Sequence, residues 1–320
     1  MAIPAHVVSV SGGKDSTATY LLALERRDRT GRDFRAVFAD TGHEHEWTLE
    51  FVNTLHEKTG GPKVRTVRAD FTDRLADHRD VIRTKWVEDG VEEDRIKRAL
   101  ELCVPTGVPF LDMAICAARF PSPIGKFCTR ELKIEPIIEQ EYLPLWDAGC
   151  TVITWQGMRR EESLARSDVP ILARLNVQDE RVKISGEVIR YLPLAAWTVK
   201  DVWKMHRRHG IEPNPLYHQG ASRVGCFPCI HADKMSIRVF AERFPEYVQR
   251  VKEWERIVSD ASKHGDATFF QHKGNPRFRG IDNVVAWSKT ARGGKFNALL
   301  PINDIRVELG TSCGEWGACE

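Results

Sequence analysis

The sequence predicts an α/β fold, a doubly wound parallel sheet with a smaller, mostly helical C-terminal subdomain. Two observations support this: short β-branched runs alternate with amphipathic helices in the N-terminal part, and the composition changes after about Leu192. The 320 residues are 42% hydrophobic and 29% charged, with a formal net charge of +2. These values are typical of a globular protein and exclude a disordered, collagen-like or coiled-coil chain.

The predicted elements follow one another as βαβ units require. The run His6–Val10 is a first strand, and Asp15–Arg27 is a helix because its apolar residues recur on one face. Phe34–Ala39 is a second strand, His45–Lys58 a second helix and Val64–Val67 a third strand. Strands separated by helices of this length indicate a parallel sheet.

The rest of the chain divides less sharply. Between Arg79 and Phe120 a helical pattern of mixed charge predicts a lid or an insertion, and Thr151–Trp155 is expected to be a later strand of the same sheet. Tryptophans, His-Arg clusters and paired cysteines then become frequent. We therefore expect a nucleotide-binding domain over residues 1–192 and a C-terminal subdomain over residues 193–320.

The chain is expected to be cytoplasmic and to have no contact with a membrane. No apolar run approaches the roughly 20 residues that a bilayer span needs, and the N-terminus lacks the basic start of a secretory signal. In the reducing cytosol the eight cysteines are not expected to form disulfides. Four of them are paired along the chain, Cys226 with Cys229 and Cys313 with Cys319.

The most informative motif is the hexapeptide Ser-Gly-Gly-Lys-Asp-Ser at residues 11–16, between the first strand and the first helix. A glycine turn there lets backbone N–H groups approach phosphate oxygens, and the helix N-terminus adds partial positive charge. Ser11 and Ser16 can donate hydrogen bonds, and Lys14 adds charge. The motif is not a Walker A loop, which needs a glycine where Val8 stands. The alternative is a plain turn in which Asp15 or Ser16 caps the helix.

In its position after an N-terminal strand, the hexapeptide resembles the pyrophosphate loop of the PP-loop ATP pyrophosphatases. This resemblance implies an adenine nucleotide alpha hydrolase-like fold and cleavage of ATP between the α and β phosphates with Mg²⁺. Further motifs lie at residues 38–44, 126–133, 157–163, 193–203, 214–217 and 225–229. In this order they resemble the phosphoadenosine phosphosulfate (PAPS) reductase family in its broad sense, over about residues 6–230. That family includes adenosine phosphosulfate reductases and the ATPase of DNA phosphorothioation systems.

The resemblance implies roles for particular residues. The phosphates would be held by five residues of the turn, Ser11, Gly12, Gly13, Asp15 and Ser16. Asp40 would lie beside the nucleotide, because ligands of doubly wound sheets gather at the carboxyl ends of the strands. Gly157 and Arg159 would form a second wall, with Arg166 near it. The catalytic residues would be Lys14, Asp15, Cys128 and Arg159, and the ligand either ATP with Mg²⁺ or PAPS.

Arg159 can also be explained without a role in nucleotide binding. Together with Arg160 it can belong to a solvated face paired with Glu161 and Glu162.

The paired cysteines predict a metal site. Cys226 and Cys229 can bring two thiolates to one metal, and Cys313 and Cys319 complete a set of four. Spacing does not separate a [4Fe–4S] cluster from a structural zinc, and the resemblance favours the cluster; thiols without metal are the third alternative. Cys128 is expected to be a further ligand, a persulfide carrier beside the adenylated substrate, or a buried thiol. A carrier needs a lowered pKa.

The end of the chain departs from the reductases of the family. Those enzymes use a cysteine in a C-terminal Glu-Cys-Gly motif, and here Ser312 precedes Cys313 and Gly314. Residues 271–295 are basic with interleaved aromatics, which suits the backbone and bases of a nucleic acid. A solvated loop that closes over a small anion is the alternative.

The sequence therefore leaves three hypotheses for the function. The first is an ATP-using enzyme that adenylates an acceptor for sulfur transfer, with a cysteine desulfurase as the expected sulfur donor. The second is a reductase that makes sulfite from PAPS or adenosine phosphosulfate with a thioredoxin-like electron donor. The third is a non-catalytic iron–sulfur or zinc protein that binds nucleic acid.

Overall fold

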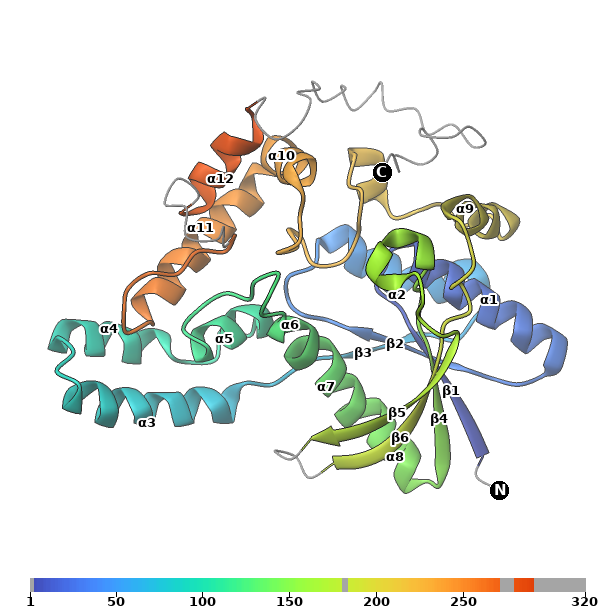
Figure 1. Cartoon of the computed structure of the whole chain (residues 1–320), viewed down its shortest axis with the longest axis horizontal. Helices are drawn as coiled ribbons and strands as arrows, with labels where there is room; N and C mark the ends of the chain where they lie inside the picture. Colours follow the sequence, from blue (N-terminus) through green and yellow to red (C-terminus); the bar gives the residue numbers. More distant parts are fainter. Residues whose placement is uncertain (1–2, 180–183, 271–278, 291–320) are drawn as a thin grey trace.

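The computed structural model describes residues 3–179, 184–270 and 279–290, and in this part of the chain it contains a six-stranded sheet. The strand order is β3-β2-β1-β4-β6-β5, and neighbouring strands are parallel except that β5 runs antiparallel to β6. The strands are β1 (Ile3–Ser9), β2 (Arg35–Ala39), β3 (Val64–Val67), β4 (Cys150–Trp155), β5 (Leu172–Asp179) and β6 (Ile184–Tyr191). The predicted fold class is thus confirmed (Figure 1).

The hairpin of β5 and β6 is the part of the sheet that the sequence did not predict. β5 is an edge strand, and its side chains Leu172 and Leu175 remain 60% and 36% exposed. An antiparallel edge strand alternates apolar and polar residues instead of forming the apolar run of a buried parallel strand. Its signal in the sequence is therefore weaker than that of β1 or β2.

Helices connect the strands and form a separate group beyond them. Those next to the sheet are α1 (Lys14–Thr30), α2 (Glu46–Thr59) and α9 (Val199–Arg208). The remaining longer helices are α3 (Thr72–Glu88), α4 (Glu93–Leu102), α5 (Pro109–Cys116), α10 (Lys234–Arg243), α11 (Pro245–Asp260) and α12 (Ile281–Ser288). The predicted helical segment Arg79–Phe120 thus corresponds to most of α3 and all of α4 and α5.

One helical segment, residues 127–147, changes its winding along its length. The short helices α6 (Phe127–Thr129), α7 (Glu135–Ile137) and α8 (Leu143–Asp147) alternate there with two π-helical turns, Arg130–Ile134 and Ile138–Tyr142. A π-helical turn widens the helix and is frequent near functional sites. The first of these turns carries Lys133, whose surroundings are described below.

The sheet is buried on both faces, as parallel sheets are. On β1 the adjacent residues Val7 and Val8 are both fully buried but belong to different core clusters. Val8 packs with residues of α1, α2 and α9, whereas Val7 packs with residues of the 127–147 segment such as Tyr142. A third cluster joins α3, α4 and α5 to α10, α11 and α12, which lie beyond the sheet in Figure 1.

That third cluster contains residues from both sides of the predicted division at 192 and 193. The division of the chain into two domains stays a prediction. No helix within the described residues is long and apolar enough to cross a membrane.

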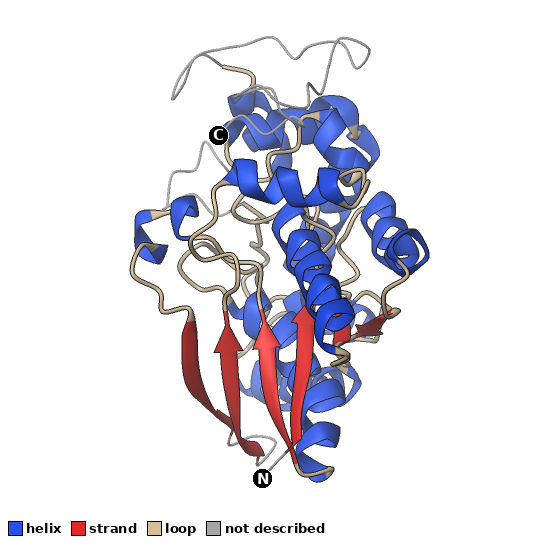
Figure 2. Ribbon diagram, turned by 90° about the vertical axis from the view of Figure 1, so that its right-hand side faces the viewer, coloured by secondary structure: helices blue, strands red, loops and turns tan. Residues whose placement is uncertain are grey.

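The strand order reverses between β1 and β4. The chain proceeds from β1 through β2 to β3 on one side and resumes at β4 on the other side of β1. Figure 2 shows loops and helices beyond the carboxyl ends of the parallel strands. In doubly wound sheets, ligands bind in the crevice at such a reversal point. The glycine turn follows β1 and residues 156–159 follow β4, so both lie at this point.

Candidate nucleotide site

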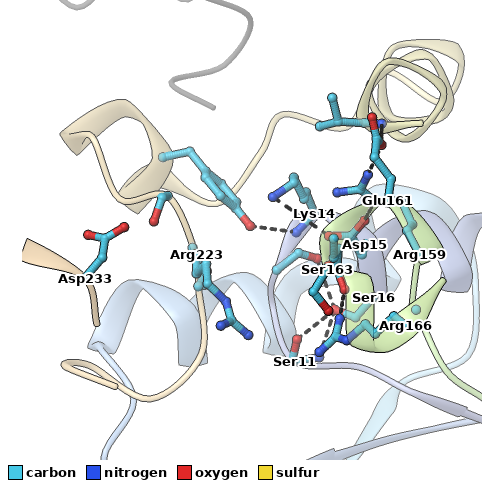
Figure 3. A pocket seen from close by; sticks show the side chains of 17 residues that line it. Ser11, Lys14, Asp15, Ser16, Arg159, Glu161, Ser163, Arg166, Arg223 and Asp233 are labelled. Carbon is cyan, nitrogen blue, oxygen red and sulfur yellow. Dashed lines mark hydrogen bonds and ion pairs between the residues drawn. The ribbon is translucent and has the colours of Figure 1, made fainter. Parts of the chain in front are cut away.

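A cavity of about 650 Å³ lies at the reversal point of the sheet. Eight residues singled out in the sequence line it: Ser11, Gly13, Lys14, Asp15, Ser16, Gly157, Arg159 and Arg166. The remaining lining residues are Glu161, Glu162, Ser163, Val199, Tyr217, Ser222, Arg223, Val224 and Asp233. Figure 3 shows that side chains from the glycine turn, the loop after β4 and the C-terminal part converge on the cavity.

The glycine turn is closed by its own hydrogen bonds. The backbone N–H of Ser11 donates to Ser16 Oγ at 3.0 Å, and Ser16 Oγ donates to the Gly13 carbonyl at 3.0 Å. Gly12 has φ +75°, and a Cβ there would lie 2.7 Å from Thr48 Cγ2. Gly12 therefore shapes the turn without lining the cavity. The turn leads into the N-terminus of α1, where the partial positive charge of a helix start favours an anion.

Two buried side chains from the C-terminal part hold Lys14 in place. The Lys14 N–H donates to Tyr217 Oη at 2.9 Å, and His206 Nε2 donates to the Lys14 carbonyl at 2.9 Å. Burial lowers the pKa of His206 and raises that of Tyr217, so both groups favour their neutral forms. The sequence motif at residues 214–217 included Tyr217 without assigning it a role, and nothing in the local sequence around His206 pointed to one.

Arg159 is buried at 2% exposure, which rules out the solvated alternative. Its Nε donates to Asp15 Oδ1 at 2.6 Å, and its guanidinium also pairs with Glu161. Glu161 Oε2 in turn accepts the N–H of Val199 at 2.9 Å, at the start of α9. These contacts link the start of α1 to the start of α9, and a buried arginine of this kind depends on its carboxylate partners.

Gly157 allows β4 to approach α1. A Cβ at this position would lie 2.7 Å from both the carbonyl carbon and the carbonyl oxygen of Asp15, and 2.8 Å from Thr19 Oγ1. Real Cβ contacts are almost never this short. A glycine is therefore required here by close packing and not by its backbone angles.

Two further arginines lie on the opposite sides of the cavity (Figure 3). Arg166 forms an ion pair with Glu162. Burial lowers the pKa of Arg166, and the charge of Arg223 lowers it further. Arg223 was not predicted from the sequence, although this residue stands only three positions before the pair Cys226 and Cys229.

Asp40, like Gly12, is a predicted nucleotide residue that does not line this cavity. It follows β2, as expected, but its carboxylate pairs with Arg68 at 3.1 Å and accepts the Gly42 N–H at 2.8 Å. Strand β2 lies on the other side of β1 from β4. Asp40 therefore follows the strand on the far side of β1 from Gly157 and Arg159.

The turn between Cys226 and Cys229 is held by two residues distant in sequence. The Phe227 N–H donates to the His43 carbonyl at 2.6 Å, and His43 Nε2 donates to the Pro228 carbonyl at 2.8 Å. Arg250 donates to the Phe227 carbonyl at 2.9 Å. The backbone between the two thiols is thus fixed from both sides.

The thiols lie near the ammonium group of Lys133. The pKa of Lys133 is raised, first by Cys226 and then by Glu44, Cys229 and Cys128. Cys226 Sγ lies 3.6 Å from Glu44 Oε1. Burial raises the pKa of the Cys226 thiol to about 12. Burial also raises the pKa of Cys128, only partly offset by Lys133. This direction is opposite to the one that a persulfide carrier needs, and which of the three expected roles Cys128 has stays a prediction.

Two of the four predicted metal ligands, Cys226 and Cys229, lie within the described residues. Within the described residues, no group of three or more His, Cys, Asp and Glu side chains is arranged to hold a metal ion. Cys313 and Cys319 lie outside these residues, as does most of the basic segment 271–295. The four-cysteine ligand set and the nucleic-acid surface remain predictions.

Known proteins resemble this chain over much of its length. The family model described as phosphoadenosine phosphosulfate reductase domain matches residues 5–102 and 115–232. An uncharacterised 37.8 kDa protein of Escherichia phage 186 is 41% identical over an alignment of 325 positions, gaps included, which covers 94% of this chain and 93% of that protein.

Other similarities are shorter or more distant. The adenosine 5'-phosphosulfate reductase of Anoxybacillus flavithermus is 34% identical over 91 residues, which cover 28% of this chain and about a third (35%) of that enzyme. The crystal structure of phosphoadenylyl-sulfate (PAPS) reductase from Candida auris in a phosphate complex aligns with a TM-score of 0.41 at 16% identity, covering 71% of this chain and 83% of that one.

Proposed function

The chain belongs to the phosphoadenosine phosphosulfate reductase family, and on this basis we propose that it binds ATP and adenylates an acceptor for sulfur transfer. In this reaction an acceptor oxygen attacks the α-phosphorus of ATP, and the bond to the leaving pyrophosphate breaks. A sulfur nucleophile then displaces AMP from the adenylated acceptor.

One observation carries the proposal: the glycine turn and the buried Arg159 line the same cavity. The helix N-terminus behind the turn and the Lys14 ammonium offer positive charge to the phosphates. Arg159 is held by Asp15 and Glu161, so that it also keeps the turn in position. Fixed positive charge at the place where pyrophosphate leaves is what this reaction requires of the protein.

Mg²⁺ would enter with ATP. Carboxylate oxygen is the ligand that Mg²⁺ prefers, and Asp15 is a carboxylate beside the turn. When bound, the ion would neutralise charge on the phosphates.

A second candidate is the reduction of an adenosine phosphosulfate. The similarity to adenosine 5'-phosphosulfate reductases over 91 residues favours it. This reaction needs a free nucleophilic thiol, for which Cys313 is the candidate, and a thioredoxin-like electron donor. The two functions differ in whether ATP is cleaved and in whether sulfite is formed.

We further propose that Cys226, Cys229, Cys313 and Cys319 hold a [4Fe–4S] cluster, with zinc as the alternative. The two described cysteines support it because their turn is fixed by His43 and Arg250, and a rigid pair of thiols suits either metal. The sulfur donor would be a cysteine desulfurase, and a nucleic acid is the candidate acceptor.

The test begins with protein purified without oxygen. Iron, zinc and pyrophosphate released from ATP are measured on the same sample, for the wild type, Asp15→Ala and Gly125→Ala, a glycine with ordinary contacts outside the cavity. With a nucleic-acid acceptor and a sulfur donor added, sulfur transfer predicts pyrophosphate and AMP from the wild type and from Gly125→Ala, and none from Asp15→Ala. Sulfite formed from an adenosine phosphosulfate, without ATP cleavage, would establish the reductase instead.

A further inference from the structure

The positively charged side chains that line the cavity differ in whether a carboxylate pairs with them. Lys14 lies 3.9 Å from Asp15, Arg159 is held by two carboxylates, and Arg166 pairs with Glu162. Arg223 also lines the cavity, but within the described chain no hydrogen bond or ion pair involves its guanidinium. Among the residues that the structure describes, Arg223 thus has no anionic partner in the cavity.

The position of Arg223 is set by the loop that carries it. The neighbouring Val224 carbonyl is so close to the glycine turn that a Cβ at Gly13 would lie 3.3 Å from it. On its other side, Ser222 Oγ is 3.2 Å from Ser236 Oγ in α10. The loop is therefore held between the turn and α10.

Arg223 and Arg166 face each other across the cavity. In Figure 3 their guanidinium groups point toward the same space, beside Ser11. Two cations so placed repel each other, which agrees with the lowered pKa of Arg166. An anion between them would turn this repulsion into attraction, and a planar guanidinium can donate two parallel hydrogen bonds to a phosphate or sulfate.

We infer that Arg223 and Arg166 form a second anion subsite, which takes the distal tetrahedral oxyanion of the ligand, either a phosphoryl or a sulfo group. This inference deepens the proposed function and rests on it for the identity of the nucleotide. The first anionic group lies at the glycine turn, and the second lies toward the loop that continues from Arg223 to Cys226. Arg223 thereby selects an anhydride, with two linked anionic groups, over a simple monophosphate.

The probes that test the subsite are inorganic pyrophosphate, sulfate and AMP, titrated calorimetrically into the full-length protein. In Arg223→Gln the dissociation constant for pyrophosphate is expected to rise about tenfold to a hundredfold, since a hydrogen bond to a charged group is lost. Arg223→Lys should lose less, because the charge remains, and AMP affinity should stay within about twofold. Arg29→Gln, on the exposed last turn of α1, removes the same charge outside the cavity and should change nothing.

The outcomes separate the two proposals. Equal pyrophosphate affinity in Arg223→Gln and the wild type, or no pyrophosphate binding by the wild type, overturns the subsite. A loss of AMP affinity as large as the loss for pyrophosphate overturns it too. Competition by sulfate in the wild type that is lost in Arg223→Gln supports the subsite and shows that it also accepts a sulfo group. If pyrophosphate binds as expected while ATP is not cleaved, the subsite stands and only the proposed reaction fails.

Discussion

Replacing Gly157 by alanine tests whether close packing of β4 on α1 shapes the nucleotide site. The added Cβ would lie 2.7 Å from the Asp15 carbonyl atoms, whereas ordinary contacts begin at 3.4 Å. The two backbones must therefore separate by about 0.7 Å, which is 3.4 minus 2.7 Å. Because backbone atoms are in the way, no side-chain rotation relieves the contact.

We expect two measurable effects of Gly157→Ala. Overpacking of this kind costs about 1–3 kcal/mol of the free energy of unfolding. The displacement also moves the start of α1 and the glycine turn, and a misplacement approaching 1 Å can cost about a hundredfold in rate. Urea unfolding followed by tryptophan fluorescence measures the first effect. Pyrophosphate release from ATP measures the second.

The matched control is Gly125→Ala. Its added Cβ would lie 3.5 Å from Ser122 Oγ, an ordinary contact, and Gly125 does not have a positive φ. If Gly157→Ala unfolds at the same urea concentration as Gly125→Ala and cleaves ATP at the same rate, the packing argument is refuted.

Three further predictions concern buried charges and pH. Arg159→Ala leaves the Asp15 carboxylate without its buried partner and should lower the free energy of unfolding by about 3–5 kcal/mol in urea titrations. Glu255→Gln places an amide N–H opposite the Ile281 N–H, which Glu255 Oε2 accepts at 2.8 Å, and should cost about 1–3 kcal/mol in the same assay. Burial and Arg26 lower the pKa of His6 from 6.5 to about 4. The folded state therefore disfavours the imidazolium, and the melting temperature should fall between pH 6.5 and 4 by more in the wild type than in His6→Gln.

Each of these predictions has its own control. Arg160→Ala removes an arginine that donates to the Val169 carbonyl, and it should cost clearly less than Arg159→Ala. Because burial raises the pKa of Glu255, its folded form takes up a proton more readily than the unfolded form, so the deficit of Glu255→Gln should grow as pH falls from 7 toward 4.5. Parallel pH profiles of the wild type and His6→Gln would contradict the prediction for His6.

Much of the fold was open to prediction because its signals are local. The glycine turn lies between a β-branched run and an amphipathic helix, and each of these patterns depends only on neighbours along the chain. The strands β1, β2, β3 and β4 were predicted to within a few residues for the same reason. The edge strand β5 was missed because its exposed alternating pattern resembles that of a loop.

The arrangement of the candidate site could not be predicted from local sequence patterns. The sequence alone determined that a glycine turn follows the first strand and that two thiols share a short turn. Only the tertiary structure decided that β4 lies beside β1, which brings Gly157 and Arg159 to the turn while Asp40 stays one strand away. Tyr217, about 200 residues from Lys14, likewise reaches it only through tertiary packing. Strand order and long-range packing depend on how all buried faces fit together, and no short stretch of sequence contains that information.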